Sequence, residues 1–250
     1  MNLRVNKESI ENVGLVIFDK DGTLIQLYNY WSRMVALRAS LAQERFGLND
    51  EKKNELIYAL GVDVERKRLR SKGPVGLRKR EIVIQAMIDF LRRCGLSVTY
   101  KTVDEIFKEA DRISLHSLPE LVKPIKGMHQ LIEGLRKKGC KIGVATTDRT
   151  ERAKLAMEFL GILDFVAFVV GEDMVSHGKP SPEMVEMILK QTRMKREETV
   201  IVGDAPTDIL MGINAGLKAS IGVCSGLTSR ERLLEMTDYV VDDISKILVA

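Results

Sequence analysis

Residues 13–24 read VGLVIFDKDGTL, and this stretch sets the expected fold of the chain. The run VGLVIF is almost continuously apolar and rich in β-branched side chains, which is typical of a strand covered on both faces. An acidic loop with Asp19 and Asp21 follows it directly. In open α/β sheets, ligands bind beyond the carboxyl ends of the strands. The stretch therefore predicts a parallel strand that delivers two carboxylates to a ligand site.

The same kind of apolar run recurs later in the chain. Further strands are predicted at residues 141–147, 165–171, 199–204, 220–223 and 239–241. Helical periodicity lies between them, at residues 128–138, 151–160, 182–193 and 208–215. Regular alternation of strand and helix is the signature of a doubly wound sheet. We therefore predict an α/β fold with a Rossmann-like, doubly wound parallel sheet.

The interval between the first two predicted strands breaks this alternation. It spans about a hundred residues and shows amphipathic helical periodicity at residues 28–46, 50–60, 81–93 and 103–116. A connection of this length does not stay structureless inside a compact domain. We expect an inserted helical domain over residues 26–123, with residues 1–25 and 124–250 forming the α/β core.

The charge of the chain is unevenly distributed. The 250 residues include 39 Lys or Arg and 35 Asp or Glu, a formal net charge of +4. Residues 66–80, RKRLRSKGPVGLRKR, contain eight of the basic residues and no acidic one. The remaining 31 basic and 35 acidic residues give the rest of the chain a net charge of −4. Any function of the basic excess must therefore be local.

Composition argues against several classes of protein. The longest apolar run, residues 165–170, has six residues, whereas a membrane helix needs about 20. The first dozen residues are polar and lack the apolar region of a secretory signal. The three cysteines form no CxxC pair. We expect reduced thiols in a cytoplasmic protein with no membrane partner.

The other predicted strands also end in polar residues. Together the strand ends and following loops contribute Asp19, Asp21, Thr146, Thr147, Lys179, Asp204 and Asp208. Carboxylates gathered at one edge repel one another unless a cation lies among them. The oxygen-preferring ion Mg²⁺ suits such a set. A metal site that faces a lysine and a threonine suits a phosphoryl group.

The order of these motifs resembles a known family. FDKDGTL, the threonine after the second strand, the lysine of GKPSP, and GDAPTD are similar to the four motifs of the haloacid dehalogenase (HAD) superfamily of hydrolases. The resemblance covers the whole chain, because the helical insertion at residues 26–123 resembles the helical cap of that family. It implies a catalytic core and a cap that selects the substrate.

The resemblance also implies a role for each motif residue. Asp19 would be the nucleophile that forms an aspartyl-phosphate, and Asp21 the general acid and base. Thr146 would bind a phosphoryl oxygen, although Thr147 could serve instead, or either threonine could cap the next helix. Lys179 would orient the nucleophile and offset phosphoryl charge.

A metal set follows from the same resemblance. Mg²⁺ would be held by Asp19, Asp204 and the main-chain carbonyl of Asp21, with Asp208 supporting the site. Thr23 would hold the loop after the first strand, close to the substrate.

Asp21 narrows the choice of reaction, because dehalogenases of this superfamily lack a carboxylate there. We expect a phosphoric monoester hydrolase that acts on a small phosphorylated metabolite, similar to phosphoglycolate phosphatases. A sugar phosphomutase is one alternative, and a catalytically silent binding protein that uses the basic segment is another. Lys20, where the family often has an apolar residue, and Thr147, where asparagine is common, leave the subfamily open.

Three interpretations of residues 66–80 stay open. The segment is a solvated surface, an anion-steering surface that contacts substrate through Arg70, Lys72 and Arg78, or a nucleic-acid contact. It lacks the interleaved aromatic residues of nucleic-acid grooves, and the rest of the chain is acidic. We therefore expect no nucleic-acid partner.

Overall fold

The computed structural model describes residues 1–70, 72–76, 80–116 and 118–250. The chain forms two compact units. The core unit comprises Met1–Gln26 and Val122–Ala250, and the helical unit comprises Leu27–Leu121. Within the described ranges, no helix has the length and apolar character needed to cross a membrane. The assignment of these units as catalytic core and substrate-selecting cap stays a prediction.

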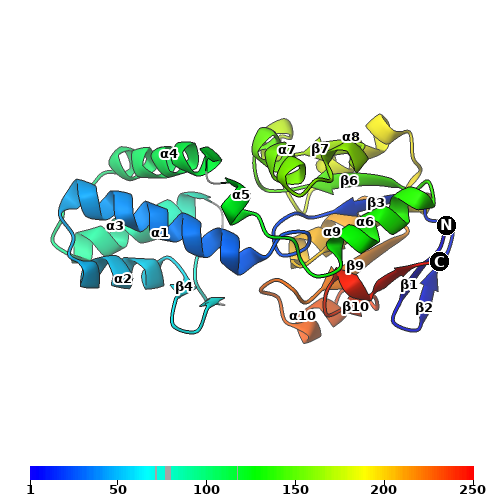
Figure 1. The fold of residues 1–250 in the computed structure, drawn as a ribbon, viewed down its shortest axis with the longest axis horizontal. Coiled ribbons are helices and arrows are strands. Elements are labelled where there is room, and N and C mark those ends of the chain that lie inside the picture. Colours follow the sequence, from blue (N-terminus) through cyan, green and yellow to red (C-terminus); the bar gives the residue numbers. More distant parts are fainter. Residues whose placement is uncertain (71, 77–79, 117) are drawn as a thin grey trace. The chain divides into compact units, whose positions relative to one another are not determined.

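A parallel sheet of six strands forms the centre of the core unit (Figure 1). Its strands are β3 (Leu15–Phe18), β6 (Lys141–Ala145), β7 (Phe168–Val170), β8 (Thr199–Gly203), β9 (Ala219–Val223) and β10 (Val240–Val241). The strand order is β10-β9-β8-β3-β6-β7, and every neighbouring pair is parallel. The predicted doubly wound α/β fold is therefore confirmed.

Strand β3 lies between β6 and β8, and Phe18 pairs with both Val144 and Val202. The chain runs from β3 outward to β6 and β7, then returns to the other side of β3 to form β8. This reversal is a topological switch point, where open α/β sheets hold their ligands. The residues that follow these three strands therefore share one edge of the sheet.

Helices pack against the faces of the sheet, where they contact the apolar side chains of the strands. The helices of the core unit are α6 (Met128–Lys137), α7 (Thr150–Phe159), α8 (Glu183–Thr192), α9 (Pro206–Asn214) and α10 (Arg230–Leu234), with 3₁₀ turns at η1 (Leu163–Phe165), η2 (Glu172–Met174), η3 (Arg196–Glu198) and η4 (Ile244–Lys246). Ile188 of α8 and Met211 of α9 pack with Ile17 in one buried cluster. Side chains alternate along a strand, so Phe18 faces the opposite layer.

Two features of the core unit differ from the sequence analysis. The run predicted as a strand at residues 165–171 begins as η1 and becomes the strand β7 only at Phe168. A separate antiparallel sheet joins β1 (Leu3–Val5), β2 (Glu8–Ile10) and β11 (Ile247–Val249). Strands of three residues are too short to show a period of their own, so the sequence pattern did not reveal them.

The helical unit consists mainly of helices, as the periodicity of its sequence predicted. Its helices are α1 (Leu27–Phe46), α2 (Asp50–Ala59), α3 (Arg80–Arg93), α4 (Tyr100–His116) and α5 (Leu118–Leu121). Asn49 caps α2 by accepting a hydrogen bond from the amide of Lys52, which satisfies one of the free donors at the helix start. Strands β4 (Val62–Asp63) and β5 (Arg68–Leu69) form a short hairpin that was not predicted from the sequence. Its second strand lies at the start of the basic segment.

Candidate active site

The predicted site residues of the core unit lie at the carboxyl edge of its sheet. Asp19 follows β3 directly, Thr146 follows β6, and Asp204 follows β8. These three strands are adjacent, so their ends lie side by side. Lys179 comes from the loop between η2 and α8, and Asp208 lies in the first turn of α9.

Lys179 joins two of the carboxylates. Its Nζ donates hydrogen bonds to Asp19 Oδ1 at 2.6 Å and to Asp208 Oδ1 at 2.7 Å. Asp19, Asp204 and Asp208 each offer a carboxylate oxygen, and these oxygens lie within 4.8 Å of one another. All three carboxylates are buried. Three buried carboxylates thus lie close together, and one ammonium group pairs with two of them.

The excess of carboxylates over ammonium groups shifts the pKa values of the cluster. Burial, together with the charges of Asp208 and Asp21, raises the pKa of Asp19 to about 7 despite the opposing effect of Lys179. Burial and the two neighbouring carboxylates raise the pKa of Asp204 well above its usual range. Burial alone would lower the pKa of Lys179, but Asp19 and Asp208 outweigh it and raise that pKa.

The donor set fits a hard divalent cation. Carboxylate oxygens are the ligands that Mg²⁺ prefers, and one lysine leaves the group of three carboxylates with an excess of negative charge. The raised pKa values of Asp19 and Asp204 express the same deficit of positive charge. Among the residues that the structure describes, this is the group whose geometry could hold a metal ion.

Glycine is required beside Asp204. Gly22 has a φ of 97°, and a Cβ there would lie 2.7 Å from the Asp204 carboxylate. A Cβ at Gly226 would overlap the same carboxylate. Ser225 Oγ donates to the carbonyl of Gly22 at 2.6 Å and so joins the two loops. Neither Ser225 nor Gly226 was predicted from the sequence, although their position shortly after β9 puts them at the same edge.

Thr23 and Asp208 support this arrangement. Thr23 is fully buried, and its Oγ1 lies 3.4 Å from Asp204 Oδ1 as a hydrogen-bond donor. Asp208 Oδ2 accepts from the amide of Ala205 at 3.0 Å, which caps the start of α9, while its other oxygen binds Lys179. One carboxylate therefore fixes both the helix start and the lysine.

The two threonines after β6 differ in position. Thr146 is buried, and its Oγ1 accepts a hydrogen bond from the amide of Asp148 at 3.1 Å. Thr147 is exposed. The N-cap of α7 is Arg149, so the alternative in which either threonine caps this helix is wrong. The Thr146 hydroxyl keeps its own proton available as a donor.

The Asp21 carboxylate lies outside the metal-binding group. Its Oδ2 pairs with Lys20 Nζ at 2.7 Å. A metal contact by Asp21 would therefore come from its main-chain carbonyl, which is how the family resemblance assigns it.

The predicted substrate contacts of the basic segment lie in the helical unit. The Arg70 guanidinium stacks over the Tyr58 ring at 4.0 Å and donates to the Tyr58 carbonyl at 2.8 Å. Lys72 is exposed. Arg78 lies outside the described residues. Arg70 is therefore held by its own unit, whereas Lys72 is a solvent-exposed residue.

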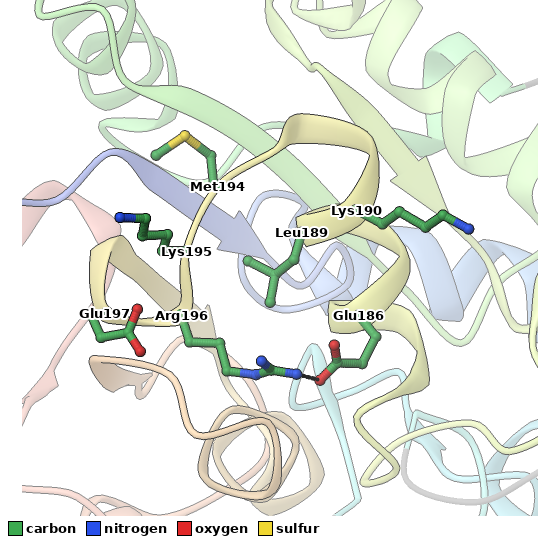
Figure 2. Close-up of a pocket in the computed structure, with 7 residues that line it drawn as sticks. All are labelled: Glu186, Leu189, Lys190, Met194, Lys195, Arg196 and Glu197. Atoms are coloured by element: carbon green, nitrogen blue, oxygen red, sulfur yellow. Dashed lines mark hydrogen bonds and ion pairs between the residues drawn. The ribbon is translucent and has the colours of Figure 1, made fainter.

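A hollow of about 380 Å³ lies elsewhere on the core unit, between α8 and η3 (Figure 2). Arg196 and Glu186 point toward each other across it and pair at 2.6 Å. Because η3 directly precedes β8, the hollow lies at the amino end of that strand. It is thus at the opposite edge of the sheet from Asp204.

Comparison with known proteins agrees with this geometry. Residues 13–216 match the family described as haloacid dehalogenase-like hydrolase. The match covers both the core motifs and the helical insertion. The chain therefore belongs to the haloacid dehalogenase-like hydrolase family, and the family predicted from the motifs is confirmed.

Two relatives of the chain are named pyrophosphatases. The chain is 31% identical to pyrophosphatase PpaX of Bacillus mycoides over 171 residues, which is 68% of this chain and 79% of that protein. It is 35% identical to pyrophosphatase PpaX of Halalkalibacterium halodurans over 102 residues, or 41% of this chain. That second alignment spans about half of the relative, 47% of its length.

Solved structures share the fold at lower identity. A predicted phosphoglycolate phosphatase from Haemophilus somnus superposes with a TM-score of 0.71 at 18% identity, covering 94% of this chain and 96% of that one. The β-phosphoglucomutase of Clostridium difficile gives a TM-score of 0.64 at 18% identity, covering 94% and 92%. Likeness at this level of identity establishes the common fold.

Proposed function

We propose that the protein is a Mg²⁺-dependent phosphatase that hydrolyses small phosphate monoesters through a phosphoryl group carried on Asp19. One observation carries the proposal. A buried carboxylate, Asp19, is held by a buried lysine at the carboxyl edge of the sheet, and two further buried carboxylates lie beside it. This set suits a nucleophile that must approach an anionic phosphoryl group.

In the first step, an Asp19 oxygen attacks phosphorus and the bond from phosphorus to the ester oxygen breaks. Lys179 holds Asp19 Oδ1 in place and offsets the charge of the phosphoryl oxygens. The Thr146 hydroxyl donates to one of these oxygens. Asp21 gives its proton to the departing alcohol, which prevents release of a high-energy alkoxide.

In the second step, Asp21 takes a proton from water, and the water oxygen attacks phosphorus. The bond from phosphorus to Asp19 breaks, which releases phosphate and restores both aspartates. Mg²⁺ held by Asp19, Asp204 and the Asp21 carbonyl would neutralise carboxylate and phosphoryl charge. In this mechanism Asp19 is therefore the nucleophile, and Asp21 transfers the protons.

Inorganic pyrophosphate is a second candidate substrate. The relatives at 31% and 35% identity are named pyrophosphatases, and pyrophosphate presents the same terminal phosphoryl group to Asp19. A phosphomutase would use the same first step but pass the phosphoryl group to a second hydroxyl. The helical unit would select among these, with Arg70, Lys72 and Arg78 as the proposed contacts for an anionic substrate.

A panel of phosphate esters tests the proposal. It contains 4-nitrophenyl phosphate, small organic monoesters that include phosphoglycolate, a hexose phosphate and pyrophosphate, each with Mg²⁺ and with EDTA. We expect phosphate release from at least one compound with Mg²⁺ and none with EDTA. Isomer formation without phosphate release from the hexose phosphate would instead identify a mutase. No turnover of any compound would favour the silent binding protein.

A further inference from the structure

The loop after β3 contains a buried lysine that the mechanism above does not use. Lys20 lies between the two catalytic aspartates and is 1% exposed. A buried ammonium group is costly unless it is paired. Lys20 Nζ lies 2.7 Å from Asp21 Oδ2 and 3.2 Å from Asp148 Oδ2. The lysine therefore links the proposed acid and base to a second carboxylate.

Asp148 is held by one side-chain hydrogen bond and by ion pairs. Its Oδ1 accepts a hydrogen bond from the amide of Arg149 at 2.8 Å. Its Oδ2 makes no hydrogen bond in the described chain but lies at ion-pair distance from Lys20 Nζ and 3.6 Å from Arg152 Nε. Its carbonyl accepts from the amide of Glu172 at 3.0 Å. Asp148 is thus anchored at the start of α7 and beside η2. Lys20 extends this anchor across the sheet edge to Asp21.

The two oxygens of Asp21 are in different environments. Oδ2 binds Lys20, whereas Oδ1 is buried and accepts no hydrogen bond from any residue that the structure describes. An ammonium group has three donors and no acceptor. The oxygen that faces Lys20 must therefore be an acceptor, so a proton on the Asp21 carboxyl group must sit on Oδ1.

We propose that Lys20, anchored by Asp148, is a positioning residue that fixes the rotation of the Asp21 carboxyl group and reserves Oδ1 for proton transfer to the leaving group. This inference rests on the phosphatase function proposed above. Proton transfer is effective only when the acid already points at the departing oxygen. Without Lys20, the carboxyl group would rotate and could place its proton on either oxygen.

Leaving-group chemistry separates this role from a merely structural ion pair. A 4-nitrophenolate ion leaves without a proton, whereas the benzyl alkoxide needs one. A positioning defect must therefore slow benzyl phosphate much more than 4-nitrophenyl phosphate. A general loss of structure, or a disturbed nucleophile, slows both esters alike. The ratio of the two rates is the informative quantity.

The experiment compares kcat/KM for the two esters in the full-length protein with saturating Mg²⁺. This constant covers the steps up to release of the alcohol and excludes hydrolysis of the phosphoenzyme, which is common to both esters. Lys20→Met keeps an unbranched apolar side chain, one heavy atom shorter, and removes the charge. Asp148→Asn weakens the anchor without altering the loop after β3. Lys141→Met is the matched control, because Lys141 binds only the Thr192 carbonyl among the contacts found for its side chain in the described chain.

We expect Lys20→Met to lower kcat/KM for benzyl phosphate roughly 10–100-fold more than for 4-nitrophenyl phosphate. Asp148→Asn should shift the ratio in the same direction by a smaller factor, and Lys141→Met should leave it unchanged. If Lys20→Met fails to fold, Asp148→Asn decides. An unchanged ratio in the folded variants overturns the role of Lys20 alone. Failure of the unmodified protein to release phosphate from these two esters and from every compound of the panel removes the proposed function itself.

Discussion

The carboxyl edge of the core sheet and the basic segment at residues 66–80 both concentrate charge, but they differ in burial. At the sheet edge, Asp19, Asp204 and Asp208 are buried around Lys179. In the basic segment, the described residues Arg66 and Arg68 are exposed. Buried charge is costly without partners, whereas water screens exposed charge. Only the buried cluster therefore demands a chemical explanation.

Removal of the nucleophile at the sheet edge should lower activity far more than any substitution in the basic segment. We expect Asp19→Asn to lower kcat for the best ester of the panel by roughly 10³-fold or more, since a nucleophile has no substitute. The measurement is steady-state kinetics with Mg²⁺ on a variant whose folding is verified by thermal unfolding. Hydrolysis at the wild-type rate would make Asp19 dispensable and would contradict the mechanism.

The same substitution in each unit should affect metal binding only in the core. Gly22 and Gly95 both have positive φ, so alanine strains either loop by roughly 1–2 kcal/mol. A Cβ at Gly22 also meets Asp204, whereas one at Gly95 meets no described atom within 4 Å. We expect Gly22→Ala to weaken Mg²⁺ binding roughly 10–100-fold and Gly95→Ala to leave it unchanged, by calorimetric titration. Equal Mg²⁺ affinities in the two variants would remove Asp204 from the metal site.

Stability should depend on pH and metal at the carboxylate cluster. The pKa of Asp19 is raised from 3.8 to about 7, so the native state binds the proton more tightly than the unfolded chain does. The associated stabilisation is complete below about pH 4 and disappears as pH rises through about 7. We therefore expect the unfolding temperature of EDTA-treated protein to fall over this window, measured against Asp19→Asn.

Added Mg²⁺ should reverse this loss. At 100 times its Kd, a ligand adds about 2.7 kcal/mol, or roughly 5–10 °C for a chain of this size. The increase should be larger at about pH 8 than at about pH 5, because protons compete with the metal for the carboxylates. A pH-independent increase would show that Mg²⁺ binds away from the buried aspartates.

The basic segment should produce the smallest effect. Arg70→Gln and Lys72→Gln together should raise KM a few-fold at low salt and reduce its salt dependence, because exposed charges act through a screened field. The readout is KM over a series of salt concentrations. Unchanged KM and salt dependence would leave residues 66–80 as a solvated surface.

Sequence patterns predicted the buried region well for a physical reason. Apolar β-branched runs mark strands that are covered on both faces, and parallel strands end at a common edge. The positions of Asp19, Thr146 and Asp204 at that edge follow from these two rules. The loop that brings Lys179 to Asp19 needed the family resemblance as well, because no strand ends at that residue.

Contacts between loops could not be predicted in this way. The packing of Gly226 against Asp204 depends on two loops that are distant in sequence. Lys20 looks like an ordinary solvated lysine until its pairs with Asp21 and Asp148 are seen. The sequence likewise does not reveal that Arg70 stacks on Tyr58 of the same unit. The sequence alone does not show whether a charged side chain is buried or which residue it pairs with.

Acid quenching of a single turnover tests the central claim most directly. The protein with Mg²⁺ is mixed with less than one equivalent of its best ester, quenched within the turnover time, digested, and mapped by mass spectrometry. We expect one phosphoryl group on the peptide that contains Asp19, absent from Asp19→Asn and absent with EDTA. Rapid turnover with no phosphoryl group on Asp19 at any quench time would contradict the covalent mechanism.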